Sequence, residues 1–240
     1  MSRVLPILFN TEMVQAILDG RKKATRRIVK SPYFVDDSGA VPLAMRTAPK
    51  GGKLERQIGA MQYPDEPYKL NDILYVRETW SWEPCWDCGM DMDEHKCCDE
   101  SAHKVFNHDK GEWGCYLYRA SFEDNVYPSV DVWHPSIHMP KEAARIWLKV
   151  TDVRVERLQE VTKEKIKSEG IYDDGTYPTD KKIKIRHECG EWTDKAYKER
   201  FAMIWDSTIK KPDISRYGWL ANPWVWVIEF ERCDKPEGET

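Results

Sequence analysis

The segment GRKKATRR, residues 20–27, combines residue types that can do hydrolytic or phosphate-binding chemistry. The hydroxyl of Thr25 could act as a nucleophile if a neighbouring base took its proton. Lys22, three residues earlier, could be that base if burial or a second cation lowered its pKa toward neutrality. A lysine and a threonine at this spacing recur in many proteins, so a turn hydroxyl beside a solvated cation is the competing interpretation. Phosphate could be held by the arginines of the segment, which are Arg21, Arg26 and Arg27.

Positive charge is concentrated in this segment although the chain as a whole is slightly acidic. The 240 residues contain 37 Lys and Arg against 41 Asp and Glu, a balance that argues against bulk binding of a polyanion. Residues 20–30 nevertheless hold six positive charges and no acid, contributed by Arg21, Lys22, Lys23, Arg26, Arg27 and Lys30. We therefore expect any nucleotide or nucleic acid to bind at this local patch.

Residues 77–80 could extend the binding surface. Arg77 could contact phosphate, and Trp80 could stack on a base of single-stranded RNA, although a tryptophan is more often packed in a core or at its rim. For Glu78 we predict an ion pair with Arg21 or Arg27, because a carboxylate near several cations is held ionised.

A second candidate site lies in an acidic, cysteine-rich segment. Residues 82–112 hold nine Asp and Glu against three Lys, and five of the seven cysteines fall between residues 85 and 115. Cys85 and Cys88 form a Cys-x2-Cys pair, which can present two thiolates to a structural zinc ion. Free thiols are an equally good interpretation, because a second regular pair is missing. The other candidate ligands are Cys97, Cys98, Cys115 and His95.

The elements that must position the basic segment are predicted from apolar periodicity. The first residues, VLPILFN, predict a short strand. A helix follows from Glu12, with Asn10 or Thr11 as its cap, and Gly20 occupies the position of a C-cap glycine. The basic segment is therefore expected to be a loop that leaves directly from a helix end.

Four further strands and two further helices are expected along the chain. Alternating apolar residues predict strands within 70–80, 116–120, 145–158 and 223–231. Helices are predicted at about 162–169 and 194–207, after the caps Thr162 and Thr193. The second helix carries an apolar stripe at helical spacing, which we assign to the core: Tyr197, Phe201, Ile204 and Trp205.

This order of elements lacks regular strand–helix–strand alternation and predicts an α+β fold, with a mixed sheet or small closed barrel and helices at its edges. We expect one domain over 1–233, a tail over 234–240, and long insertions at about 31–69, 82–115 and 172–192. Neither a signal peptide nor a membrane span is recognisable, which predicts a cytoplasmic protein without a membrane partner.

Several stretches of the chain together resemble the ASCH domain, a family of the PUA-like β-barrel superfamily. They are LFNTEMVQAILDGRKKATRRIVK, LNDILYVRETW, WHPSIHMPKEAARIWLKVTDVRVERLQEVT with EGI behind it, FAMIWDS and NPWVWVIEF. The arrangement is similar to ASCH proteins of bacteriophages and prophages and covers somewhat under half of the chain. The resemblance implies a small β-barrel with flanking helices and insertions.

The same resemblance implies activity on RNA or on a modified nucleoside. Some ASCH members resemble ribonucleases, and one bacterial subgroup hydrolyses the acetyl amide of acetylcytidine with a Lys, a Thr and a Glu. Carried over to this chain, these residues are Lys22, Thr25 and Glu169. Lys23 stands where the family motif usually has Thr, and its ammonium could lower the pKa of Lys22 or help to bind phosphate.

Two other functions fit the same residues. The basic segment could be a non-catalytic module that binds RNA or another nucleic acid, with Arg77 and Trp80 contributing contacts. Alternatively, the chain could be a phage accessory protein that binds a host protein through the acidic, cysteine-rich insertion.

Overall fold

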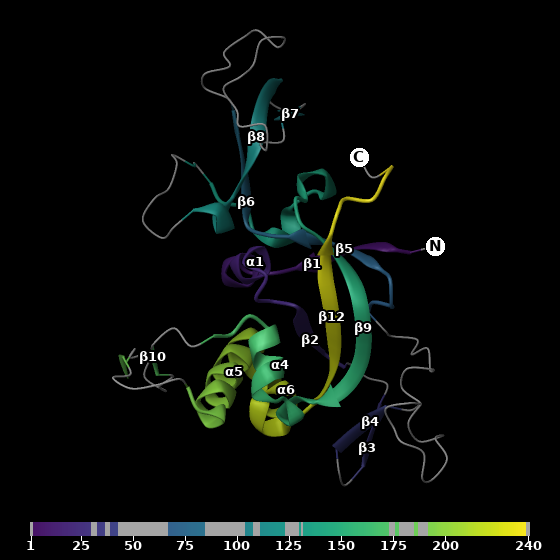
Figure 1. Cartoon of the computed structure of the whole chain (residues 1–240), viewed down its shortest axis with the longest axis vertical. Coiled ribbons are helices and arrows are strands. Elements are labelled where there is room, and N and C mark those ends of the chain that lie inside the picture. The colour runs from purple at the N-terminus through teal and green to yellow at the C-terminus, as the bar shows by residue number, and fades with distance from the viewer. Residues whose placement is uncertain are drawn as a thin grey trace. The chain divides into compact units, whose positions relative to one another are not determined.

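The computed structural model shows strands, helices and short 3-10 turns (Figure 1). It describes residues 2–29, 33–36, 39–42, 67–84, 104–107, 111–122, 130, 132–172, 176–177, 185–186 and 192–238. Among these residues no helix combines the length and apolar content needed to cross a membrane.

The largest sheet has five strands in the order β1-β5-β9-β12-β2. β1 pairs with β5 in parallel, whereas β12 and β2 are antiparallel, so the sheet is mixed. The predicted α+β class is confirmed. A closed barrel is not detected among the described strands, because their linear order leaves β1 and β2 at opposite edges. The strands span Val4–Leu8 (β1), Ala24–Ile28 (β2), Ile73–Arg77 (β5), Trp147–Arg157 (β9) and Trp224–Cys233 (β12).

Shorter strands occur within the segments predicted as insertions. A three-stranded sheet has the order β6-β8-β7, and two further pairs join β3 to β4 and β10 to β11. Short local pairing of this kind can form within a polar insertion without a large core. The bounds are Tyr33–Asp36 (β3), Gly39–Pro42 (β4), Trp80–Pro84 (β6), Lys104–Asn107 (β7), Glu112–Tyr118 (β8), Thr176–Tyr177 (β10) and Ile185–Arg186 (β11).

The predicted helices are confirmed together with their caps. In α1, Asn10 Oδ1 accepts a hydrogen bond from the Met13 amide at 2.9 Å. The hydroxyls of Thr162 and Thr193 accept hydrogen bonds from amides in the first turns of α4 and α5. Each cap satisfies an amide that has no partner inside its helix. The helices span Thr11–Leu18 (α1), Lys163–Ser168 (α4), Asp194–Thr208 (α5) and Ile214–Tyr217 (α6).

In the part of the chain that the structure describes, six 3-10 turns connect the longer elements. They span Arg119–Ser121 (η1), Ser136–His138 (η2), Lys141–Ala143 (η3), Leu158–Glu160 (η4), Lys211–Asp213 (η5) and Trp219–Ala221 (η6).

The chain folds into two compact units. The first comprises residues 1–18, 73–148 and 232–240, and the second comprises residues 19–72 and 149–231. The second unit has an apolar core that includes Tyr197, Phe201 and Trp205, as their helical spacing predicted. Whether the units act as the single domain expected over 1–233 stays a prediction.

The first unit is held partly by a buried ion pair. Glu78 is 1% exposed, and its two carboxylate oxygens accept hydrogen bonds from Arg145 Nε and Nη2, both at 2.9 Å. The guanidinium carbon of Arg145 also lies 4.1 Å from the centroid of the Tyr118 ring. A two-point contact of this kind satisfies a buried carboxylate that would otherwise be costly to desolvate.

Removing one partner of this pair should destabilise the first unit. Arg145→Met leaves the Glu78 carboxylate buried without its counter-charge, and we expect the free energy of unfolding to fall by roughly 3 kcal/mol. Urea unfolding of Arg145→Met, Glu78→Gln and the double variant measures this loss. The double variant should lose less than the sum of the single variants, whereas strict additivity would show that the two groups are not coupled.

Candidate functional site

The basic segment is positioned by a strand rather than by a loop. Residues 24–28 form β2, in which Thr25 pairs with Ile228 and Arg26 pairs with Val227 of β12. The prediction of a loop over residues 20–27 was therefore wrong for its second half. A strand this rich in cations is stable here because acidic side chains of the same unit neutralise Arg26.

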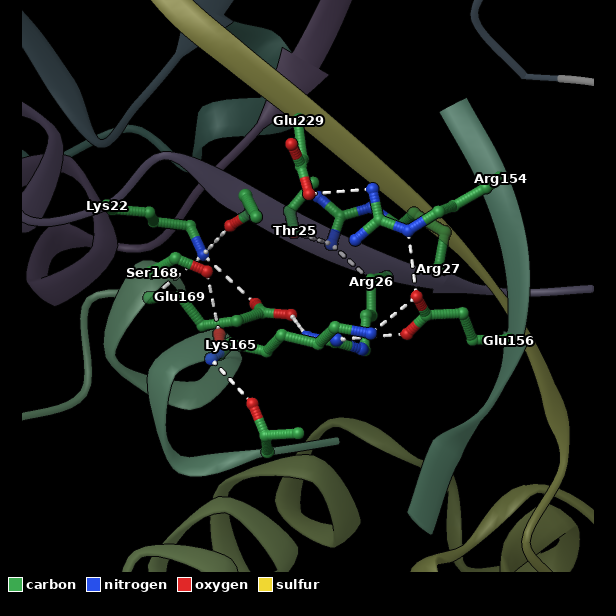
Figure 2. Close-up of polar contacts among 12 residues, drawn as sticks. Lys22, Thr25, Arg26, Arg27, Arg154, Glu156, Lys165, Ser168, Glu169 and Glu229 are labelled. Carbon is green, nitrogen blue, oxygen red and sulfur yellow. Dashed lines mark hydrogen bonds and ion pairs between the residues drawn. The ribbon is translucent and has the colours of Figure 1, made fainter. Parts of the chain in front are cut away.

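Lys22 and Glu169 meet as a buried ion pair (Figure 2). Lys22 Nζ donates hydrogen bonds to Glu169 Oε2 at 3.2 Å, to the Glu169 carbonyl at 3.0 Å and to the Ala24 carbonyl at 2.9 Å. The side chain of Lys22 is 0% exposed and that of Glu169 is 8% exposed. These three acceptors match the three protons of an ammonium group.

Backbone geometry fixes where the Glu169 carboxylate lies. Glu169 is the C-cap residue of α4, and its amide donates to the Ile166 carbonyl. Gly170 then has a φ of +89°, in the left-handed region that glycine adopts most easily. On the other side, the Lys23 amide donates to the Ser168 carbonyl at 2.7 Å. The end of α4 is thus held directly against the residues that precede β2.

Arg26 binds the second oxygen of the same carboxylate. Its Nη1 donates to Glu169 Oε1 at 2.6 Å, and its Nη2 lies 3.6 Å from Glu156 Oε2. The Arg26 side chain is 1% exposed, and its guanidinium lies 5.8 Å from the Phe201 ring of α5. Sequence reasoning assigned Arg26 to phosphate, but the arginine instead orients Glu169 from inside the unit.

Glu156 joins Arg26 to two further cations. Its Oε1 accepts hydrogen bonds from Arg154 Nε and Lys165 Nζ, both at 2.7 Å. Burial alone would raise the pKa of Glu156, but the hydrogen bonds from Lys165 and Arg154 prevail and lower it. Arg154 also pairs with Glu229 at 2.6 Å. Figure 2 shows the resulting chain of charges, which runs from Glu229 to Lys22.

Thr25 and Arg27 form a separate contact on β2. The hydroxyl of Thr25, which is 1% exposed, accepts a hydrogen bond from Arg27 Nη1 at 3.1 Å. The alternation of the strand places these two residues on one face and Arg26 on the other. A guanidinium beside a hydroxyl oxygen favours the ionised form of that hydroxyl. The structure therefore brings Lys22 and Glu169 together and pairs Thr25 with Arg27.

Burial is the main influence on the charge of Lys22. It lowers the pKa of Lys22, Glu169 opposes that change, and the positive charges of Arg27 and Arg26 add smaller decreases. Burial likewise lowers the pKa of Arg27, with Tyr68 and Glu169 acting in the opposite direction. Sequence reasoning looked to Lys23 for a decrease in the pKa of Lys22, yet Lys23 is exposed and the decreases come from burial and from the two arginines.

Arg21 has its partners at the outer end of the Lys22–Glu169 bridge. Its Nε and Nη2 donate to Asp19 Oδ2, and its Nη1 donates to the Gly170 carbonyl at 3.0 Å. The guanidinium carbon also lies 4.4 Å from the centroid of the Tyr172 ring.

The candidates at 77–80 belong to the first unit and have partners there. Glu78 pairs with Arg145, so the prediction of an ion pair with Arg21 or Arg27 was wrong. The guanidinium of Arg77 donates to the carbonyls of Met139 and Ile137. Trp80, as the more common reading for tryptophan suggested, packs against the rings of Tyr116 and His134.

The zinc site stays a prediction, because most of its ligands are outside the described residues. Cys115 lies in β8 and is partly buried. Within the described part of the chain, no group of three or more His, Cys, Asp and Glu could hold a metal ion. The candidates outside the described residues are Cys85, Cys88, Cys97, Cys98 and His95.

Sequence reasoning missed the acids and cations that surround Arg26. A signal was present in TDVRVERL, where Asp152, Arg154 and Glu156 recur at every second residue and therefore share one face of β9. Alternation of charge on one strand face predicts a partner surface of mixed charge. Here that surface includes Arg26 of β2, Lys165 of α4 and Glu229 of β12.

Comparisons of the chain with protein-family models, with curated proteins and with solved structures found no match.

The geometry predicts how Lys22 titrates. We expect its pKa to lie below the ordinary lysine value of 10.5, because burial penalises the ammonium form. Glu169→Gln should lower it further, since the carboxylate favours the charged form. Carbon-13 NMR of the lysine Cε groups against pH measures both values, with the Lys22 signal assigned by its loss in Lys22→Met.

Two titration results would contradict the expected decrease in the pKa of Lys22. A Lys22 pKa at or above 10.5, or an increase in Glu169→Gln, would show that the pair with Glu169 outweighs burial or does not form.

Proposed function

We propose that Lys22, Thr25 and Glu169 form a hydrolytic site for the amide of a modified nucleoside such as acetylcytidine. The observation that carries the proposal is the buried contact between Lys22 Nζ and Glu169 Oε2 at 3.2 Å. It joins a candidate base from the start of β2 to a carboxylate from the end of α4, which are 147 residues apart in the chain. Two groups of this kind are what proton transfer to and from an amide requires.

In the proposed reaction, the Thr25 oxygen attacks the carbonyl carbon of the acetyl amide. The hydroxyl proton passes to the neutral amine of Lys22. It then passes through the Glu169 carboxylate that Lys22 contacts to the leaving nitrogen as the carbon–nitrogen bond breaks, so that Lys22 and Glu169 return to their starting states. Water then cleaves the acetyl ester on Thr25, which releases acetate and restores the hydroxyl. The net change is one amide and one water converted to an acid and an amine.

The environment of each group supports its part in this reaction. A neutral Lys22 amine has two N–H donors, whereas three acceptors surround it. On deprotonation we therefore expect Lys22 to lose its longest hydrogen bond, which is the one to the Glu169 carboxylate. Burial, which lowers the pKa of Lys22, favours that neutral state. Arg27, which donates to Thr25 Oγ1, would stabilise negative charge as it develops on that oxygen.

The resemblance to ASCH domains supports the same assignment. The family residues carried over by motif were Lys22, Thr25 and Glu169, and two of them are in contact. Membership of the PUA-like superfamily and its barrel remain part of this proposal. Ribonuclease activity is the variant of the proposal in which the scissile bond is a phosphodiester, and the substrates offered in the assay distinguish the two.

A non-catalytic RNA-binding role is the second candidate, favoured by the exposed ammonium of Lys23 beside the partly exposed Arg21. Such binding should weaken as salt rises, because phosphate contacts release counterions. Arg26 should contribute little to it, because its guanidinium is already paired with Glu169 and Glu156.

An assay of acetylcytidine hydrolysis tests the proposed function. Lys22→Ala and Thr25→Ala should each lower kcat by roughly 100-fold or more, the usual contribution of a base or a nucleophile. Lys23→Ala is the matched control, since Lys23 is an exposed lysine next to Lys22, and it should retain turnover within about threefold.

Two results would contradict the hydrolase. One is the absence of turnover by the purified wild-type chain, and the other is full activity in both variants. If an RNA oligonucleotide then binds with a steep dependence on salt that Lys23→Ala reduces, the binding module is the better description.

A further inference from the structure

Tyr172 presents an exposed aromatic ring close to the proposed site. The residue is 53% exposed, although it follows Glu169 by only three positions. Three residues span at most about 10 Å of chain, a distance that one bound nucleoside can bridge. An exposed tyrosine is common on protein surfaces, so its position beside the Lys22–Glu169 bridge and its contact with Arg21, rather than its exposure alone, are what point to a ligand.

Arg21 supports one side of this ring. The guanidinium carbon lies 4.4 Å from the ring centroid, within the range of a favourable cation–π contact. The planar guanidinium of arginine is well suited to stacking on an aromatic face. The ring of Tyr172 is thereby held in one orientation before any ligand arrives.

Arg21 is itself fixed at three points. Nε and Nη2 donate to Asp19 Oδ2 at 3.1 and 2.6 Å, and Nη1 donates to the Gly170 carbonyl at 3.0 Å. Asp19 neutralises the guanidinium, so the cation serves as a support for the ring more than as a site for phosphate. A side chain held in this way loses little further entropy when a ligand binds.

The position of this stack follows from the Lys22–Glu169 bridge. Lys22 and Glu169 lie opposite each other in an antiparallel bridge, so Arg21 and Gly170 are the next residues outward from it. The side chain of Arg21 also donates a hydrogen bond to the Gly170 carbonyl, which joins these two neighbouring residues. The stack of Arg21 and Tyr172 therefore adjoins the bridge on the side where the chain emerges to solvent.

We infer that Tyr172, backed by Arg21, is the surface on which the nucleobase of the substrate stacks. The inference rests on the proposed function and adds to it the group that recognises the base. Its ligand class is a nucleoside with a planar, aromatic base, because stacking uses the π-face that every base has. Choice among bases would require hydrogen bonds to their edges, which this ring does not provide.

The test is a comparison of Tyr172→Ala and Tyr172→Phe in the full chain. With acetylcytidine, Tyr172→Ala should raise KM roughly tenfold, equal to about 1.4 kcal/mol and within the usual range for base stacking, while kcat changes less than about twofold. Tyr172→Phe should retain the KM of wild type, because the ring and not the hydroxyl makes the contact.

A matched control is available on α6. The guanidinium carbon of Arg216 lies 5.1 Å from the ring centroid of Tyr217, which gives another arginine–tyrosine contact away from the Lys22–Glu169 bridge. Tyr217→Ala should leave KM unchanged. A merely structural effect of losing a stacked ring would appear in both alanine variants.

Calorimetric titration with cytidine, the product, separates this inference from the proposed function. Binding that weakens roughly tenfold in Tyr172→Ala and persists in Tyr172→Phe supports the stacking surface, even if acetylcytidine is not hydrolysed and the hydrolase proposal fails. If wild type hydrolyses acetylcytidine but Tyr172→Ala keeps both its KM and its affinity for cytidine, the stacking surface is wrong. No binding of cytidine to wild type also overturns it.

Discussion

The second unit depends on one buried carboxylate that neutralises two buried cations. Glu169 accepts hydrogen bonds from Lys22 on one oxygen and from Arg26 on the other, and all three side chains are nearly inaccessible to water. Moving such charges out of water is costly unless they are paired with good geometry. This requirement explains why β2 can carry Arg26 inside a folded unit.

The charges around this centre are arranged in alternating sign. Glu156 lies between Arg26 on one side and Arg154 and Lys165 on the other, so no buried cation is without an acid nearby within the described chain. In such a network each side chain is oriented by its neighbours, and the contribution to stability cannot be divided into independent pairs. A carboxylate held in this way has little freedom to rotate, and the proton transfer that we propose for Glu169 would benefit from such a fixed orientation.

Local sequence patterns predicted the helices and their caps, but they could not predict which residues distant in sequence form ion pairs. Caps such as Asn10 and Thr193 act through residues three positions away, so sequence alone could find them. The partner of Glu78 is Arg145, which is 67 residues distant, and local charge density pointed to the wrong arginines. The resemblance by motif supplied Glu169 without geometry. The contacts of Arg26 with Glu169 and with Glu156 join separate helices and strands, so only the folded structure could reveal them.

The bridge between Lys22 and Glu169 also fixes the register of β2, the strand that follows it. Lys22 contacts both the side chain and the backbone carbonyl of Glu169, which fixes its position. Because side chains alternate along a strand, the number of residues between Lys22 and a position in β2 determines whether that side chain faces α5, as Arg26 does. Deleting one residue between Lys22 and Thr25 would turn the strand over and exchange the places of hydroxyl and guanidinium. A change in chain length within this short span should therefore be far more damaging than a substitution of similar kind.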